Sequence, residues 1–129
     1  MHDKIKELRF NPKMAQDFFV KKLAYIIGPK QLKELMEQDK INIIDVRKTE
    51  DYNVGHIPTA ISMPKDTIGE NIDKLSKEKL TVVYNCSEYC MGAALACLTL
   101  ADYDYPCVMM NGGFKAWAEH YRYAIVRED

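Results

Sequence analysis

The stretch that decides the fold covers residues 80–100 and reads LTVVYNCSEYCMGAALACLTL. It opens with a short apolar run, Leu80–Tyr84, whose β-branched residues predict a strand that is buried on both faces. It closes with an Ala- and Leu-rich run over residues 92–100, which predicts a helix. Cys86 lies between the two, at the carboxyl end of the expected strand, where open α/β sheets bind their ligands.

The position of Cys86 favours a reactive thiol. The first turn of the following helix has unpaired N–H groups and the positive end of the helix dipole, which stabilise an anion. A cysteine in this setting is available as a thiolate nucleophile. The alternative is a buried structural cysteine, because free cysteines often act as small hydrophobic residues. The position of Cys86 alone does not decide between a reactive thiol and a structural cysteine.

Composition limits the class of protein. A chain of 129 residues predicts a single domain with its own core. The net charge of −1, without a basic block, gives no reason to expect nucleic acid or a membrane as partner. The four cysteines lie in the last third of the chain and do not form a disulfide framework, so we expect a reducing cytoplasm. Two of the four, Cys97 and Cys107, are expected in the core.

Short apolar runs alternate with helical patterns along the chain. The expected strands cover residues 24–27, 41–46, 60–63, 80–84 and 107–110. The expected helices cover residues 29–38, 49–54 with Thr49 as the cap, 67–75, 92–100 and 114–121. This alternation predicts an α/β fold with a mainly parallel sheet and helices on both faces.

The N-terminal residues form a region of their own. Residues 1–10 are polar and are expected to be loosely ordered, and Asn11 and Pro12 are typical of a helix start. We divide the chain into an N-terminal helical extension, 1–23, and a domain, 24–129. The apolar stripe that contains Met14 and Phe18 indicates a helix that packs on the domain or binds a partner.

Several motifs follow one another in a fixed order. They are IDVR at 44–47, DYNVGHIP at 51–58, VVYNC at 82–86 and NGGFKAW at 111–117. As an ordered set, over about residues 26–120, they resemble the rhodanese-like domain family. The resemblance implies a five-stranded, mainly parallel sheet flanked by helices. It also implies that Cys86 is the sulfur-accepting cysteine, which carries a persulfide between a sulfur donor and an acceptor.

Three polar residues of these motifs are expected to support the site. Asp45 and Arg47 end a strand and can order the surrounding loops by charge-assisted hydrogen bonds. His56 lies in a turn and is expected to hold loops together rather than to act as a general base. Gly112 and Gly113 are expected at positive φ or at a close backbone approach.

The active-site loop departs from the family pattern. Active members usually have Cys-x-x-Gly-x-Arg followed by Ser or Thr, whereas here Cys86 is followed by Ser87, Glu88, Tyr89, Cys90, Met91 and Gly92. Met91 removes the guanidinium that would bind an anionic donor such as thiosulfate. The loop N–H groups can still hold a persulfide. We therefore expect a small-molecule or protein persulfide as donor rather than thiosulfate, with a small molecule or a protein as acceptor.

Cys90 is the second departure. It can attack a Cys86 persulfide, which releases sulfide and leaves a disulfide, or it is a bystander. The spacing of the two is not that of a zinc knuckle, so we expect no metal and no cofactor.

Glu88 and Met91 favour a rival hypothesis, a catalytically weak rhodanese-fold binding or regulatory module. A phosphatase or arsenate reductase is disfavoured, because their related loops are one residue longer and need an Arg. The sequence gives no oligomeric state.

Overall fold

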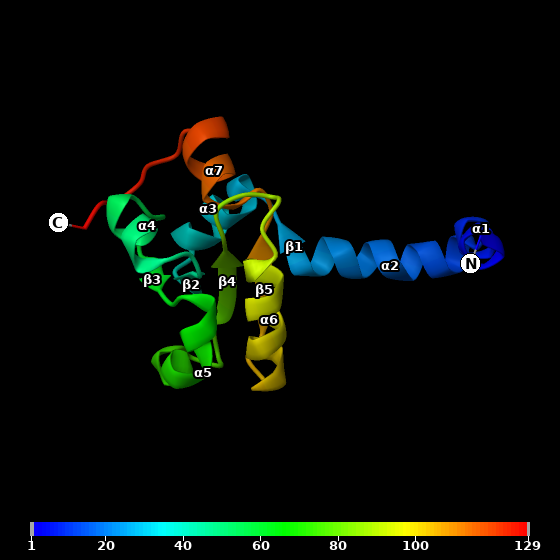
Figure 1. The fold of residues 1–129 in the computed structure, drawn as a ribbon, viewed down its shortest axis with the longest axis horizontal. Coiled ribbons are helices and arrows are strands. Elements are labelled where there is room, and N and C mark those ends of the chain that lie inside the picture. Colours follow the sequence, from blue (N-terminus) through cyan, green and yellow to red (C-terminus); the bar gives the residue numbers. More distant parts are fainter. Residues whose placement is uncertain (1, 129) are drawn as a thin grey trace.

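The computed structural model describes residues 2–128. Within them, five strands form one parallel sheet in the order β1-β5-β4-β2-β3 (Figure 1). The strands are β1 (Ile26–Ile27), β2 (Ile41–Asp45), β3 (Ile61–Ser62), β4 (Leu80–Tyr84) and β5 (Cys107–Met110). The predicted α/β fold with a parallel sheet is therefore confirmed.

Helices cover both faces of the sheet. One face packs against α3 (Pro29–Glu37), α4 (Thr49–Val54), α7 (Gly113–Lys115) and η3 (Ala116–His120). The other face packs against α5 (Ile68–Asn71) and α6 (Gly92–Asp102). The central strand β4 contributes to both cores, since Val82 and Tyr84 belong to the first and Val83 to the second. This double burial is why the sequence of β4 does not alternate between apolar and polar residues.

Three expected helical features differ in the structure. Lys48, not Thr49, is the N-cap of α4, and no side chain caps this helix. The helix expected over 67–75 is broken into η1 (Lys65–Thr67), α5 and η2 (Ile72–Lys74). Its interior contains Asn71, whose side chain donates to the Thr67 carbonyl at 2.9 Å and so competes with regular helical bonding. The closing helix expected over 114–121 is the short α7 followed by η3, a π-helical turn.

The N-terminal residues form a helical arm, α1 (His2–Arg9) and α2 (Pro12–Tyr25). The expectation that residues 1–10 are loosely ordered is wrong, at least for the described residues from 2 onward. The helix start at Asn11 is confirmed, because its Oδ1 accepts the Met14 N–H at 3.2 Å. Figure 1 shows α2 projecting away from the sheet, and none of its described side chains is buried. The alternative of a helix packed on the domain is therefore wrong.

Candidate active site

Cys86 lies just beyond the carboxyl end of β4, and its side chain is exposed. Backbone N–H groups of α7 hold the chain at this point: Phe114 donates to the Asn85 carbonyl at 2.7 Å, and Lys115 donates to the Cys86 carbonyl at 2.9 Å. This close approach needs Gly113, which has φ 63° and whose Cβ, if present, would lie 2.6 Å from the Asn85 carbonyl oxygen. The expectation of positive φ at both glycines of the NGG motif is confirmed.

The loop after Cys86 curls back on itself. A disulfide joins Cys86 to Cys90, and their Cα atoms are 6.5 Å apart, a separation that disulfides commonly span. The Cys90 N–H donates to the Ser87 carbonyl at 3.2 Å, which closes the loop. The two loop cysteines are thus within bonding reach.

More basic than acidic side chains line the cleft at the exposed thiol position. Cys86, Cys90 and Met91 line a cleft of about 450 Å³, whose charged residues are Arg47, Lys48, Lys65 and Asp51. The two lysines, whose side chains are exposed, were not recognised in the sequence. They come from the segments after β2 and after β3, so only the sheet order brings them to the end of β4. The positive charges favour an anionic sulfur species in the cleft.

The predicted loop residues do not all line this cleft. Ser87, Glu88 and Tyr89 line a second hollow of about 470 Å³, on whose walls are also Gly112 and Lys115. Only Cys86, Cys90, Met91 and Gly92 of the expected loop face the first cleft. The loop therefore separates two hollows.

Three loop N–H groups are already engaged within or beside the loop. The Cys86 N–H donates to Asn85 Oδ1 at 2.8 Å, the Tyr89 N–H to Ser87 Oγ at 3.3 Å and the Cys90 N–H to the Ser87 carbonyl. In this disulfide form, the loop cradle that the sequence suggests for a persulfide therefore lacks these three donors.

Asn85 explains one departure of the loop from the family pattern. Gly92 stands where related loops have Ser or Thr, and a Cβ at this position would overlap the side-chain amide of Asn85. The same Asn85 side chain accepts from the Cys86 N–H. A side chain at position 92 would therefore have to displace the Asn85 amide from its place beside Cys86, a coupling that only the three-dimensional structure shows.

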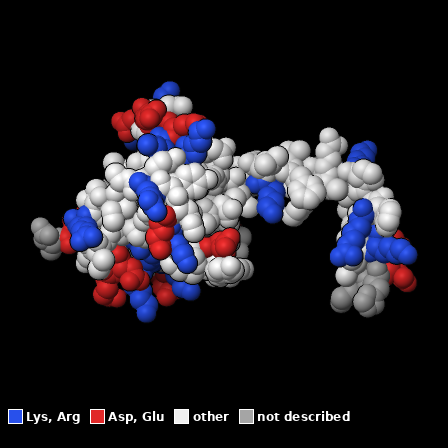
Figure 2. Space-filling model, turned by 90° about the horizontal axis from the view of Figure 1, so that it is seen from above, with Lys and Arg blue, Asp and Glu red and all other residues white. Residues whose placement is uncertain are grey.

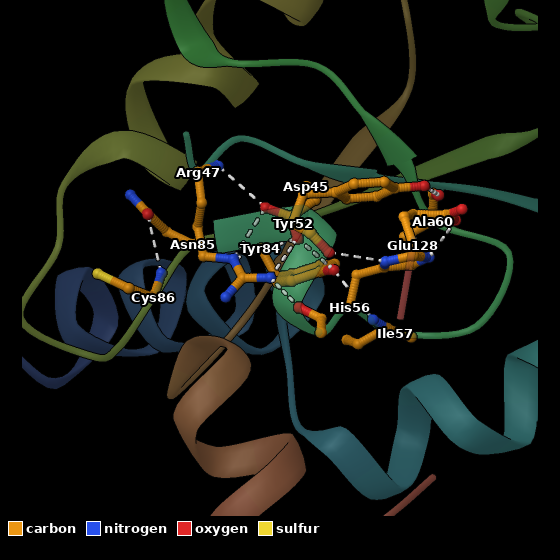
Figure 3. Close-up of polar contacts among 11 residues, drawn as sticks. Asp45, Arg47, Tyr52, His56, Ile57, Ala60, Tyr84, Asn85, Cys86 and Glu128 are labelled. Carbon is orange, nitrogen blue, oxygen red and sulfur yellow. Dashed lines mark hydrogen bonds and ion pairs between the residues drawn. The ribbon is translucent and has the colours of Figure 1, made fainter. Parts of the chain in front are cut away.

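Asp45 and Arg47 form a buried ion pair behind the cleft (Figure 3). Arg47 Nη2 donates to Asp45 Oδ2 at 2.7 Å and to the Gly55 carbonyl at 2.6 Å. The Tyr84 hydroxyl donates to Asp45 Oδ2 at 2.6 Å and accepts the Ile57 N–H at 3.1 Å. Burial alone lowers the pKa of Arg47, but Asp45 outweighs it and the net shift is upward. Burial and the Asp45 carboxylate raise the pKa of Tyr84 well above its usual range, so its hydroxyl stays a donor.

His56 is buried and ties α4 to the C-terminal tail. Its Nδ1 lies 2.9 Å from the Tyr52 carbonyl oxygen, and its ring stacks on the Tyr52 ring at 3.7 Å. Its Nε2 lies 3.4 Å from Glu128 Oε1, and its backbone forms an antiparallel bridge with Val126. These contacts are those of a residue that holds segments together, and its supporting role in the site stays a prediction.

Among residues 2–128, no three His, Cys, Asp or Glu side chains gather in a way that could hold a metal ion. In the same part of the chain, no helix has the length and apolar character that a membrane crossing requires.

Known proteins share this sequence pattern. The family model of the Rhodanese-like domain matches residues 28–120. The putative sulfurtransferase YtwF of Bacillus subtilis is 33% identical over 92 residues, which cover 70% of this chain and 87% of YtwF. The probable adenylyltransferase/sulfurtransferase MoeZ of Mycobacterium tuberculosis is 31% identical over 96 residues, or 72% of this chain and 24% of MoeZ. This chain spans only 24% to 36% of the length of the first curated relatives.

Solved structures share the fold as well. The BH2092 protein from Bacillus halodurans superposes with a TM-score of 0.82 and 32% identity, over 91% of this chain and 87% of that chain. Because residues 28–129 make up less than this share, the match includes part of the helical arm. The resemblance that the motifs indicate is confirmed, and the chain belongs to the rhodanese-like domain family.

Proposed function

We propose that the chain is a sulfurtransferase that carries sulfur as a persulfide on Cys86. The observation that carries the proposal is the exposed position of Cys86 after β4, in a cleft that Lys48 and Lys65 also line. Positive charge near a thiol favours the thiolate, which is the nucleophile. The similarity to YtwF and MoeZ, which are named as sulfurtransferases, supports the same role.

The first step loads the sulfur. The Cys86 thiolate attacks the outer sulfur of a donor persulfide, R–S–SH. The donor S–S bond breaks and its electron pair leaves with the thiolate R–S⁻, while a new S–S bond forms on Cys86. The sulfur oxidation levels are exchanged between donor and protein, so this step needs no external oxidant.

The second step involves Cys90, whose bond to Cys86 shows that the two sulfurs can meet. The Cys90 thiolate attacks Cys86 Sγ, the bond to the outer sulfur breaks, and hydrosulfide leaves. The product is the Cys86–Cys90 disulfide, which a dithiol or low-molecular-weight thiol must reduce before the next cycle. A reducing cytoplasm supplies such thiols, and we place the protein there.

The donor is a small-molecule or protein persulfide rather than thiosulfate. Arg47 is committed to Asp45 and to the Gly55 carbonyl, and Met91 offers no donor. The remaining cations, Lys48 and Lys65, are exposed and hydrated. They can attract an anion, but they lack the planar fork of donors that binds an oxyanion in two places.

Intact-mass analysis tests the proposal on reduced protein that has been incubated with a low-molecular-weight persulfide. We expect Cys90→Ser to gain the mass of one sulfur atom and to keep it. Native protein should release one sulfide per chain. Its final mass should then be lower than that of the reduced protein by two hydrogen atoms, as expected for the Cys86–Cys90 disulfide. The control variant Cys97→Ser should behave as native protein does.

Two results would argue against this function. A sulfur gain that persists in Cys86→Ser would place the persulfide elsewhere. A folded, reduced native protein that neither gains sulfur nor releases sulfide would favour the rival hypothesis of a binding or regulatory module, for which the exposed loop residues Glu88 and Tyr89 would be the contact surface.

A further inference from the structure

The helical arm has an exposed apolar surface. At 3.6 residues per turn, the larger apolar side chains of α2 are spread over more than half of the circumference of the helix. Each of six is more than half exposed: Met14, Phe18, Phe19, Val20, Leu23 and Tyr25. A helix that is apolar over so much of its circumference is normally buried against other elements.

A matching groove lies at the root of the arm. It is an apolar hollow of about 680 Å³ between α6 and β5, lined among others by Tyr25, Leu98, Ala101, Tyr105 and Met109. Leu98 is 61% exposed on its rim. The groove begins where α2 joins β1, since Tyr25 and Ile26 line both it and a smaller hollow along α2.

We propose that the occupant of this groove is the arm of a second copy of the chain. The arm cannot fill its own groove, because α2 is one continuous helix that runs away from the sheet (Figure 1). In a two-fold arrangement, α2 of each copy lies across the α6–β5 groove of its partner. Both apolar surfaces of both copies are then covered by a single, self-complementary contact.

The charges of arm and body are complementary. Residues 1–23 contain six Lys and Arg but three Asp and Glu, whereas residues 24–129 contain twelve and sixteen. In Figure 2 the projecting arm shows mainly basic side chains, whereas the body shows acidic and basic side chains together. Asp104 lines the groove, and α2 carries Lys22 in addition to Lys21, which pairs with Asp17 at 3.1 Å. An arm therefore attracts the body of another copy.

The arm offers a large apolar surface for this contact. Its three aromatic side chains, Phe18, Phe19 and Tyr25, are each more than half exposed. Aromatic side chains bury about 150–250 Å² each when fully covered, so these three offer roughly 300 Å² per chain. The exposed parts of Met14 and Leu23 on the arm and of Leu98 in the groove add to this area, toward the about 800 Å² per partner that stable protein interfaces bury.

Sedimentation equilibrium of the full chain tests this proposal. We expect native protein to sediment as a dimer of twice 14.9 kDa. Phe18→Glu in the arm and Leu98→Glu in the groove should each weaken the dimer at least tenfold. The control Val54→Glu, at a position 71% exposed on α4, should leave the dimer unchanged.

Mixing the two variants locates the contact. Phe18→Glu has a native groove and Leu98→Glu a native arm, so their mixture restores one of the two arm–groove contacts and should associate more strongly than either variant alone. Circular dichroism confirms that both variants are folded, as expected for exposed positions. A native chain that stays monomeric at micromolar concentration would overturn the proposal, even if it bound anionic vesicles or another protein. A dimer lost only in the arm variant would show that arms pair with arms, which overturns the groove as the contact.

Discussion

Met91 decides how the cleft treats an anionic sulfur donor. Its side chain is 70% exposed and lines the cleft beside Cys86. The nearest guanidinium, that of Arg47, is held by Asp45 and lies 4.1 Å from the centre of the Phe114 ring. It cannot turn toward a donor without breaking a buried ion pair, which typically costs about 3–5 kcal/mol.

Replacing Met91 by Arg should therefore improve thiosulfate as a donor. Each charge-assisted hydrogen bond contributes about 1.5–3 kcal/mol, which corresponds to about 10- to 100-fold in kcat/KM. Steady-state thiosulfate:cyanide assays on reduced protein measure the effect, with Met91→Leu as the control that changes shape but not charge. Native protein that already uses thiosulfate well, and that Met91→Arg does not improve, would contradict this account.

The other two cysteines interact across the groove between α6 and β5. Cys107 Sγ donates to the Cys97 carbonyl at 3.3 Å, and both residues are half-buried. The Cys97 thiol also stabilises a Cys107 thiolate by a hydrogen bond, which lowers the pKa of Cys107 to about 7. The same bond, with burial, raises the pKa of Cys97. Cys107 is thus the more acidic thiol of this pair, and it gives up its hydrogen bond to the Cys97 carbonyl when it ionises.

We expect Cys97→Ala to return the pKa of Cys107 toward its ordinary value. A lowered pKa means that the thiolate exists at pH 7, so loss of the donor reduces the thiolate fraction and slows alkylation of Cys107 at that pH about tenfold. Iodoacetamide rates between pH 6 and 9, followed by peptide mapping, measure the midpoint. The protein is kept reduced, so that labelling of Cys86 in the same digests is the internal reference. An unchanged Cys107 midpoint would show that Cys97 does not act on it.

Among the elements, α7 matters more to the site than its length suggests. Its first N–H groups hold the carbonyls of Asn85 and Cys86, and thereby fix the loop that carries the thiol. Gly113 makes this possible because any side chain there would meet the backbone of residues 85–87. The short helix α7 thus positions Cys86 through hydrogen bonds to the backbone of the loop.

Gly113→Ala should both destabilise the protein and disturb Cys86. The positive φ and the backbone clash together should lower the free energy of unfolding by about 2–4 kcal/mol. The control is Gly69→Ala in α5, where a Cβ has only an ordinary contact at 3.7 Å with the Tyr103 hydroxyl. Urea unfolding and persulfide loading measure the two effects. Equal stability of the two variants would contradict the argument.

At the scale of the whole molecule, the sequence predicts most of the sheet but not the surroundings of the site. The strand at Leu80–Tyr84 was recognisable because a buried central strand needs a continuous apolar run. Lys48, Lys65 and Asn85 were missed, because their closeness to Cys86 or Gly92 depends on strand order and on packing. The sequence indicates a helix at the N-terminus but not its direction. Its apolar stripe is compatible with packing against the domain or against a partner, and nothing in the local pattern decides between them.

The Cys86–Cys90 disulfide stands apart from what holds the fold together. The two cores lie on opposite faces of the sheet, and Cys86 is exposed beyond the carboxyl end of the central strand β4. The bond closes a loop of only four residues' separation. Because the entropic stabilisation from a disulfide grows with loop length, a loop this short contributes about 2 kcal/mol.

Reduction should therefore leave the protein folded. We expect a reductant to lower the unfolding temperature by no more than about 10 °C, with unfolding still cooperative, because both cores remain intact. Differential scanning calorimetry with and without reductant measures this, and Cys90→Ser should match reduced native protein under both conditions. Loss of the unfolding transition on reduction would make the disulfide a structural one. A folded reduced form is what sulfur transfer requires, because only there is the Cys86 thiolate free to attack a donor.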